Sequence, residues 1–275
     1  MTEKRQERRH NSVKAYLKEP FLHSSDARPL RILAEYLEPR SRFDHFKIED
    51  TIVFMGSARL ISREQATAEV AAAERGEGDL ERAQSRFAMS RYYEEARELA
   101  RRFTEWSKGL EDDGQRFVVC TGGGPGIMEA ANRGASEAKG LNIGLTISIP
   151  LEEFDNRYVT RELSFHFHYF FMRKFWFSYL AKALLVFPGG FGTLDEVFEI
   201  LTLRQTGKMR KPMVIVLFGT QYWDDVIDFE ALVRHGTINR EDLQLFHRTD
   251  SMDEAFEIVT RQLAEHAMGK PGAIL

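Results

Sequence analysis

The stretch ALLVFPGGFGTLDE, residues 183–196, decides the fold. Its first five residues form an uninterrupted apolar run, which is typical of a buried strand. The PGGFG segment that follows is typical of a tight turn, and residues 193–206 carry helix formers. Glycine lets a ligand approach the backbone closely, and the start of a helix offers unpaired N–H groups. The stretch therefore predicts a strand, a glycine turn and a helix whose first turn could hold a phosphate.

A second stretch, RFVVCTGGGPG at residues 116–126, repeats this arrangement before a predicted helix at 127–139. Tight packing between a strand and a helix also selects glycine, so one such turn alone would be weak support for a phosphate site. Neither turn contains the Gly-Lys-Ser/Thr of a P-loop, and the glycines at 122, 124 and 126 do not give G-x-G-x-x-G. Together the two turns favour a mononucleotide-sized ligand over ATP hydrolysis or NAD-linked hydride transfer.

The rest of the chain alternates short apolar runs with helical segments. Further strands are predicted at 52–55, 143–149 and 213–218, and helices at 63–75, 79–109, 165–182, 222–234, 240–246 and 252–267. Such alternation indicates βαβ units around a parallel sheet that is covered on both faces. We therefore expect an α/β protein with a Rossmann-like doubly wound parallel sheet, helices on both faces, and extra N-terminal and C-terminal helices.

The domain boundaries follow from the same pattern. Residues 1–48 predict a helical arm, with a partly disordered tail over the first dozen residues as the alternative. Residues 49–275 predict one Rossmann-like nucleotide-binding domain. Within it lie a helical insertion at about 63–112 and C-terminal helices at about 222–267.

Composition restricts the possible partners. The 275 residues include 38 Lys and Arg against 42 Asp and Glu, a formal net charge of −4, which gives no reason to expect a nucleic acid partner. The single cysteine, Cys120, excludes an intrachain disulfide and a cysteine-based zinc site, and it is expected to be a small apolar core residue. The N-terminus lacks the apolar region of a secretory signal, and charges interrupt the apolar stretch 163–187. We expect a cytoplasmic protein without a membrane partner.

Four motifs together resemble one protein family. They are PGGFGTLDE at 188–196, GGGPGIM at 122–128, REL at 161–163 and MRK at 172–174. This combination resembles the LOG ("lonely guy") family of cytokinin-activating enzymes and their bacterial relatives, long labelled lysine decarboxylases. The resemblance covers about residues 50–220. It implies a homodimeric phosphoribohydrolase that splits a nucleoside 5′-monophosphate, AMP-like, into base and ribose 5-phosphate without a metal or organic cofactor.

The resemblance also implies roles for individual residues. Arg173 and Glu196 correspond to the catalytic pair. The implied substrate-binding residues are Gly56, Ser57, Gly122, Gly123, Gly124, Gly126, Met128, Glu162, Lys174, Gly189, Gly190, Phe191, Gly192, Thr193, Leu194, Asp195 and Thr202.

The chemistry of the pair is reasonable without the family. Cleavage of an N-glycosidic bond passes through an oxocarbenium-like ribose, which the Glu196 carboxylate would stabilise. The alternative for Glu196 is a helix-dipole carboxylate that contributes about 0.3–1 kcal/mol. Arg173 would reach the phosphate or the transition-state charge, and its alternative is a structural ion pair.

Several alternatives remain at this stage. His166 and His168 could bind a metal, but we expect them in the core or a dimer interface because no third ligand lies nearby. A non-catalytic nucleotide or molybdenum-cofactor-like carrier is the competing function. Lysine decarboxylation needs pyridoxal phosphate on a lysine, and no lysine stands in a recognisable site for it.

Overall fold

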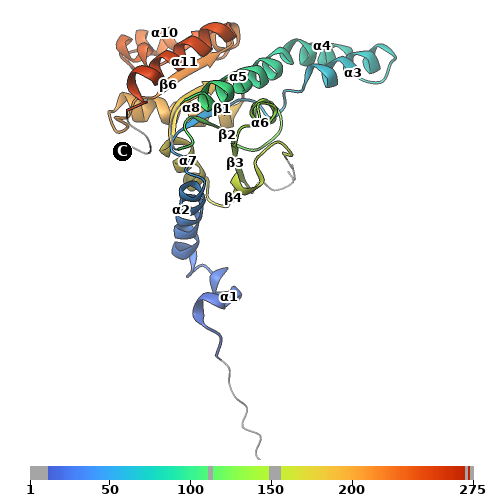
Figure 1. The fold of residues 1–275 in the computed structure, drawn as a ribbon. Coiled ribbons are helices and arrows are strands. Elements are labelled where there is room, and N and C mark those ends of the chain that lie inside the picture. Colours follow the sequence, from blue (N-terminus) through green and yellow to red (C-terminus); the bar gives the residue numbers. More distant parts are fainter. Residues whose placement is uncertain (1–11, 111–113, 149–155, 270–271, 273–275) are drawn as a thin grey trace, which may run out of the picture.

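The computed structural model describes residues 12–110, 114–148, 156–269 and 272, and its fold is the expected Rossmann-like one (Figure 1). Seven strands form one sheet in the order β4-β3-β2-β1-β5-β6-β7, and every adjacent pair is parallel. The strands are β1 (Thr51–Met55), β2 (Val118–Thr121), β3 (Asn142–Ile147), β4 (Ser164–Phe167), β5 (Ala181–Val186), β6 (Val214–Phe218) and β7 (His247–Thr249).

Strand order reverses between β1 and β5, which are neighbours although three strands separate them in sequence. In doubly wound sheets, ligands bind outside the carboxyl ends of the strands at this reversal. Both predicted glycine turns lie at that edge, since one follows β2 and the other follows β5.

Helices cover both faces of the sheet, as the apolar strands require. On one face Ile52 and Phe54 pack with α5 (Arg91–Lys108), α6 (Ile127–Glu137) and α11 (Met252–His266). On the other, Val53 and Met55 pack with α2 (Arg28–His45), α7 (Phe170–Tyr179) and α8 (Phe191–Gln205). Successive side chains of a strand point to opposite faces, so the five buried residues of β1 contribute to both cores.

The predicted helix at 165–182 is wrong in its first part. Residues 164–167 form the edge strand β4, in which Phe165 and Phe167 are buried and Ser164 and His166 are exposed. This alternation is the strand period of two, hidden in the sequence by the aromatic residues that follow. α7 begins only at Phe170.

Other helices are more divided than predicted. The helix at 79–109 is two helices, α4 (Leu80–Met89) and α5, and the first ends at Ser90, whose hydroxyl donates to the Phe87 carbonyl. The segment 222–234 is likewise α9 (Thr220–Val226) and α10 (Phe229–Arg234). The segment 240–246 is the 3-10 helix η3 (Arg240–Leu245), and the short strand β7 follows it where none was predicted.

Two helical parts extend from the body of the molecule (Figure 1). One is α3 (Arg63–Glu74) with α4, which project beyond the sheet, whereas α5 of the same predicted insertion belongs to the helical layer over it. The other is the arm formed by η1 (Ala15–Leu17), α1 (Glu19–Leu22) and the first half of α2. The tail predicted for the first dozen residues lies almost entirely outside the described residues. Of the helices in the described part, none has the length and apolar character to cross a membrane.

Candidate functional site

Three loops meet at the carboxyl edge of the sheet, and backbone hydrogen bonds join them. The Phe187 N–H donates to the Met55 carbonyl (2.8 Å), and the Ser57 N–H donates to the Pro188 carbonyl (2.9 Å). The Ile127 N–H donates to the Ser57 carbonyl (3.1 Å). The loop at Gly56 and Ser57 is therefore held between the two glycine loops.

Packing explains much of the first glycine loop, residues 122–126. Gly126 has φ +71°, and a Cβ there would clash with the Ser57 carbonyl oxygen. A Cβ on Gly122 or Gly124 would lie 2.7 or 2.8 Å from the Met128 side chain. These glycines let the loop fit closely against β1 and α6, so their presence does not by itself indicate a ligand.

The second glycine loop is more open. Gly189 is buried, and its carbonyl accepts a hydrogen bond from the Tyr222 hydroxyl (2.7 Å). By contrast, a Cβ on Gly190 or Gly192 would meet nothing within 4 Å. Phe191, the first residue of α8, is 93% exposed. The start of α8 therefore offers accessible backbone N–H groups, which suits an anionic ligand.

Arg173 and Glu196 form an ion pair between α7 and α8. Arg173 Nη2 lies 3.2 Å from Glu196 Oε1, and the Glu196 residue is only 8% exposed. Burial raises the pKa of the Glu196 carboxyl to about 7, although the charges of Arg173 and Lys174 oppose this shift. The next residue of α7, Lys174, contacts Asp195, the residue before Glu196. The MRK motif at 172–174 therefore meets the PGGFGTLDE motif at the first turns of α8.

Aromatic rings enclose the guanidinium of Arg173. Its Cζ lies 5.1 Å from the Phe170 ring centre and 5.5 Å from that of Phe177. Burial lowers the pKa of Arg173, and its Nε has no hydrogen-bond partner among the described residues. Phe177 also lies beside Gly122, so the ion pair borders the first glycine loop as well as the second.

Lys174 is held by two carboxylates. Its Nζ lies 2.7 Å from Asp195 Oδ2 and 2.8 Å from Glu199 Oε2. Burial would lower the pKa of Lys174, but the hydrogen bonds to these carboxylates raise it on balance. Lys174 and Asp195 thus lie at the site with their charges paired to each other.

The remaining predicted residues divide into those near the loops and those away from them. Thr193 is buried beneath Gly189, and Leu194 is half-buried on the same turn of α8. Thr202 is exposed, donates to the Phe198 carbonyl of its own helix (2.7 Å), and lies about 9 Å along α8 from Glu196. Glu162 precedes the edge strand β4, where its carbonyl accepts a hydrogen bond from Arg42 (2.9 Å). Among the contacts of the described residues, Arg173 and Glu196 pair with each other, and neither bonds to the side chain of Glu162 or Thr202.

His166 and His168 are both exposed, so the core alternative predicted for them is wrong, and a place in a dimer interface stays a prediction. His166 instead joins two hydroxyls, Thr146 (3.0 Å) and Ser148 (2.7 Å). The sequence could not indicate this group, because its members meet only through the pairing of β3 with β4. Within the described ranges, no three His, Cys, Asp or Glu residues are grouped to hold a metal ion. Cys120 is buried as predicted, and burial raises the pKa of its thiol.

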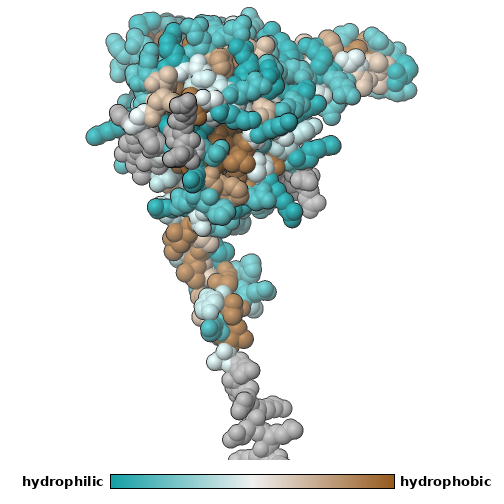
Figure 2. All heavy atoms as spheres, in the orientation of Figure 1, coloured by the Kyte–Doolittle hydropathy of each residue, from teal (hydrophilic) through white to brown (hydrophobic). Residues whose placement is uncertain are grey.

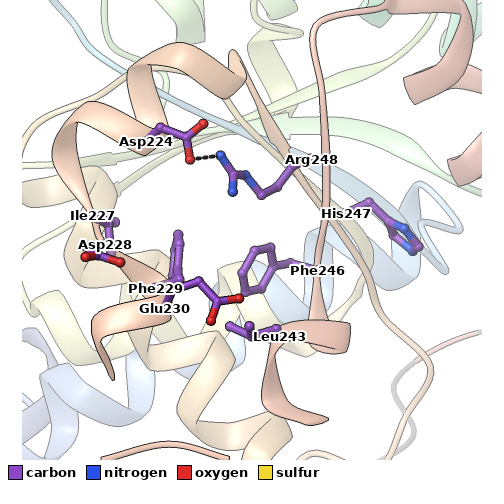
Figure 3. A pocket seen from close by; sticks show the side chains of 9 residues that line it. All are labelled: Asp224, Ile227, Asp228, Phe229, Glu230, Leu243, Phe246, His247 and Arg248. Atoms are coloured by element: carbon purple, nitrogen blue, oxygen red, sulfur yellow. Dashed lines mark hydrogen bonds and ion pairs between the residues drawn. The ribbon is translucent and has the colours of Figure 1, made fainter. Parts of the chain in front are cut away.

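A cavity of about 510 Å³ lies elsewhere, beside β7 (Figure 3). Apolar side chains line one part of it, and Asp224 and Arg248 form an ion pair at another. None of the predicted site residues lines this cavity. Because its charged groups are paired with each other or with nearby arginines, we assign the site to the glycine loops rather than to this cavity.

Part of the chain matches a known protein family. Residues 128–259 match a family model described as possible lysine decarboxylase. No curated protein matches the chain. Among solved structures, the chain is similar to TM1055, with 19% identity, a TM-score of 0.49 and coverage of 77% of this chain and 99% of that one.

Two further structures are similar. One is the molybdenum cofactor carrier protein MCP from Chlamydomonas reinhardtii, with 17% identity, a TM-score of 0.43 and coverage of 78% of this chain and 99% of that one. The other is the molybdenum cofactor binding protein from the phototrophic bacterium Rippkaea orientalis, with 15% identity, a TM-score of 0.43 and coverage of 78% and 98%. The matched segment 128–259 holds the Arg173–Glu196 pair and the second glycine loop. The match to the family described as possible lysine decarboxylase thus covers a little under half of the chain, including the second glycine loop and this ion pair.

Proposed function

We propose that the protein hydrolyses the N-glycosidic bond of a nucleoside 5′-monophosphate to give the free base and ribose 5-phosphate. The observation that carries this proposal is the enclosed Arg173–Glu196 ion pair, next to the open backbone at the start of α8. A buried carboxylate near a phosphate-binding turn is the arrangement that such a reaction requires.

The geometry supports separate roles for the second glycine loop, Glu196 and Arg173. The phosphate would bind the backbone around Gly190 and Gly192, which places the ribose toward the next turn of α8, where Glu196 lies. As the C1′–N bond breaks, its electron pair leaves with the base, which takes up a proton. The Glu196 carboxylate stabilises the positive charge on the ribose and orients a water molecule, whose oxygen bonds to C1′. The Arg173 guanidinium suits the phosphate or the charge of the departing base.

Pyridoxal phosphate, which lysine decarboxylation would require, does not fit Lys174 of the site or the buried Lys211. A Schiff-base lysine must be available as a neutral amine. Lys174 is paired with Asp195 and Glu199, which raises its pKa and favours the charged form. Burial does lower the pKa of Lys211, to about 7, but its amine donates to the carbonyls of Ser178 and Tyr179. Neither lysine supports the decarboxylase reaction.

A product assay tests the proposal. The full chain is incubated separately with AMP, GMP, CMP, UMP and IMP, and free base and ribose 5-phosphate are measured. We expect release from at least one monophosphate, and a loss of about 10²–10⁴-fold in kcat for Glu196→Gln and Arg173→Ala. Glu257→Gln is the matched control, because Glu257 is an exposed residue of α11 on the far face and should leave the rate unchanged.

Two other results would contradict the proposal. Binding of a monophosphate without base release would favour the carrier function. Base release that survives both substitutions would place the chemistry on other residues.

A further inference from the structure

Two strands extend past their neighbour beside the first glycine loop. Thr121, the last residue of β2, pairs with Gly144, which in turn pairs with Ser164. β3 and β4 therefore continue for three residues beyond the end of β2. Their extension carries Thr146, Ser148 and His166, which we call the hydroxyl–histidine group.

This group stands directly against the glycine loop. Gly123 has φ +68°, and a Cβ on it would lie 2.5 Å from Thr146 Cγ2. The loop therefore lies between this group and the ring of Phe177, which borders Arg173. The hydroxyl–histidine group and the Arg173–Glu196 pair therefore lie on either side of the first glycine loop.

Hydrogen bonds fix the direction in which the group presents its donors and acceptors. The Thr146 hydroxyl donates to the Phe165 carbonyl (2.7 Å), so its oxygen accepts from His166 Nδ1–H (3.0 Å). In this tautomer the neutral imidazole has its lone pair on Nε2, which accepts the proton of the Ser148 hydroxyl (2.7 Å). The Ser148 oxygen then has only lone pairs left for a ligand, and its residue is exposed.

The distance across the sheet suits a nucleotide. The second glycine loop follows β5, and the strand order from there is β5, β1, β2, β3. Three strand intervals of about 4.8 Å give roughly 14 Å between the start of α8 and the end of β3. If the phosphate binds at α8, as in the proposed function on which this inference rests, the base extends toward Ser148.

We propose that Ser148, oriented by His166, reads the edge of the base. An exocyclic amino group, as in AMP and CMP, can donate to the Ser148 oxygen. The carbonyl that replaces it in IMP and UMP would place two acceptors against each other. Ser148 is thus a specificity-determining residue, and His166 is a positioning residue that acts through it.

Ratios of catalytic efficiency test this inference. We expect the wild-type protein to have a higher kcat/KM for AMP than for IMP and for CMP than for UMP. Ser148→Ala and His166→Ala should each lower these ratios by about 3–10-fold, the effect of one hydrogen bond, and Ser148→Thr should restore them. His168→Ala is the matched control, since His168 is an exposed neighbour outside the group, and it should leave the ratios unchanged.

The outcomes separate this inference from the proposed function. Dissociation constants for AMP and IMP, measured by calorimetry, decide the inference even if no base is released. Equal wild-type affinity for the amino and carbonyl bases would overturn it. It would also be overturned if Ser148→Ala weakened both ligands equally, because the group would then only support the loop.

Discussion

Glu196 is almost fully buried, and burial opposes the charged carboxylate form in which it would act in the proposed reaction. Burial raises its pKa to about 7, against the attraction of Arg173. The carboxyl is therefore poised to change its charge near neutral pH, where a group that orients water or accepts a proton is most effective. A fully exposed glutamate on the same helix would lack this property.

The raised pKa of Glu196 predicts a pH-dependent contribution to stability. Between pH 4.5, its ordinary pKa, and about 7, the folded protein holds a proton that the unfolded chain releases. The free energy of unfolding contributed by Glu196 therefore falls as pH rises through this range. The stability difference between the wild type and Glu196→Gln should be smaller at pH 8 than at pH 5, by up to about 3 kcal/mol.

Urea denaturation of both proteins at pH 5 and pH 8 measures this change. The difference between the wild type and Glu196→Gln is taken at each pH, and the two values are compared. Any pH-independent loss of stability from leaving Arg173 without its partner then cancels. A difference that stays constant or grows toward pH 8 would mean that Arg173 keeps the carboxylate ionised at pH 5.

The two glycine loops differ in the role that glycine has in each. Gly126, which immediately precedes α6, has φ +71°, and a side chain there would clash with the Ser57 carbonyl and separate the loops that meet at the site. Gly190, which immediately precedes α8, has φ −84° and open space around it. The first glycine is required by the fold, and the second leaves the backbone accessible.

This difference predicts opposite results from the same substitution. Gly126→Ala should destabilise the protein by about 2 kcal/mol or more, because it combines a strained φ with a backbone clash. Gly190→Ala should change the free energy of unfolding by less than about 0.5 kcal/mol. Urea denaturation of the two variants measures both changes in the free energy of unfolding. Similar decreases in both would mean that the second loop is also constrained by packing.

The elements also show how far the sequence could be interpreted. Five strands (β1, β2, β3, β5 and β6) and both glycine turns were predictable, because each strand is rich in apolar residues and is followed closely by glycine or proline. β4 was not, since only Phe165 and Phe167 alternate with polar residues before the aromatic helix α7 begins. The Arg173–Glu196 pair came from family motifs. The Ser148–His166 contact could not be predicted, because the register between two strands creates it.

At the scale of the whole molecule, α2 joins the body to the arm. The carboxylate of Glu35 accepts hydrogen bonds from the backbone N–H groups of His168 and Tyr169, and its carbonyl accepts one from the Trp176 indole (2.9 Å). This anchors the helix beside the strand-to-helix turn that leads to Arg173. The arm extends away from the body, so few of its side chains can be buried there (Figure 1). Figure 2 shows hydrophobic residues along the surface of the arm.

These exposed side chains form a stripe along α2. Leu30, Leu33 and Leu37 are each about half exposed, at 49%, 50% and 50%, and their spacing of three and four residues places them on one side of the helix. Tyr16 and Leu17 of η1 are also exposed, at 65% and 60%. An exposed apolar stripe of this kind is typical of an interface rather than of a solvated helix.

We expect a second copy of this chain to cover the stripe, which agrees with the homodimer that the family resemblance implies. Replacing Leu30, Leu33 and Leu37 together by Ser removes apolar contact area from the interface without touching Glu35, so the folded monomer should persist. Light scattering after size exclusion at micromolar concentration should give the mass of a dimer for the wild type and of a monomer for the triple variant. Arg28→Ser, an exposed change on another side of α2, is the control and should remain dimeric. A monomeric wild type would show that something other than a second copy covers the arm, and a triple variant that stays dimeric would place the interface on another surface.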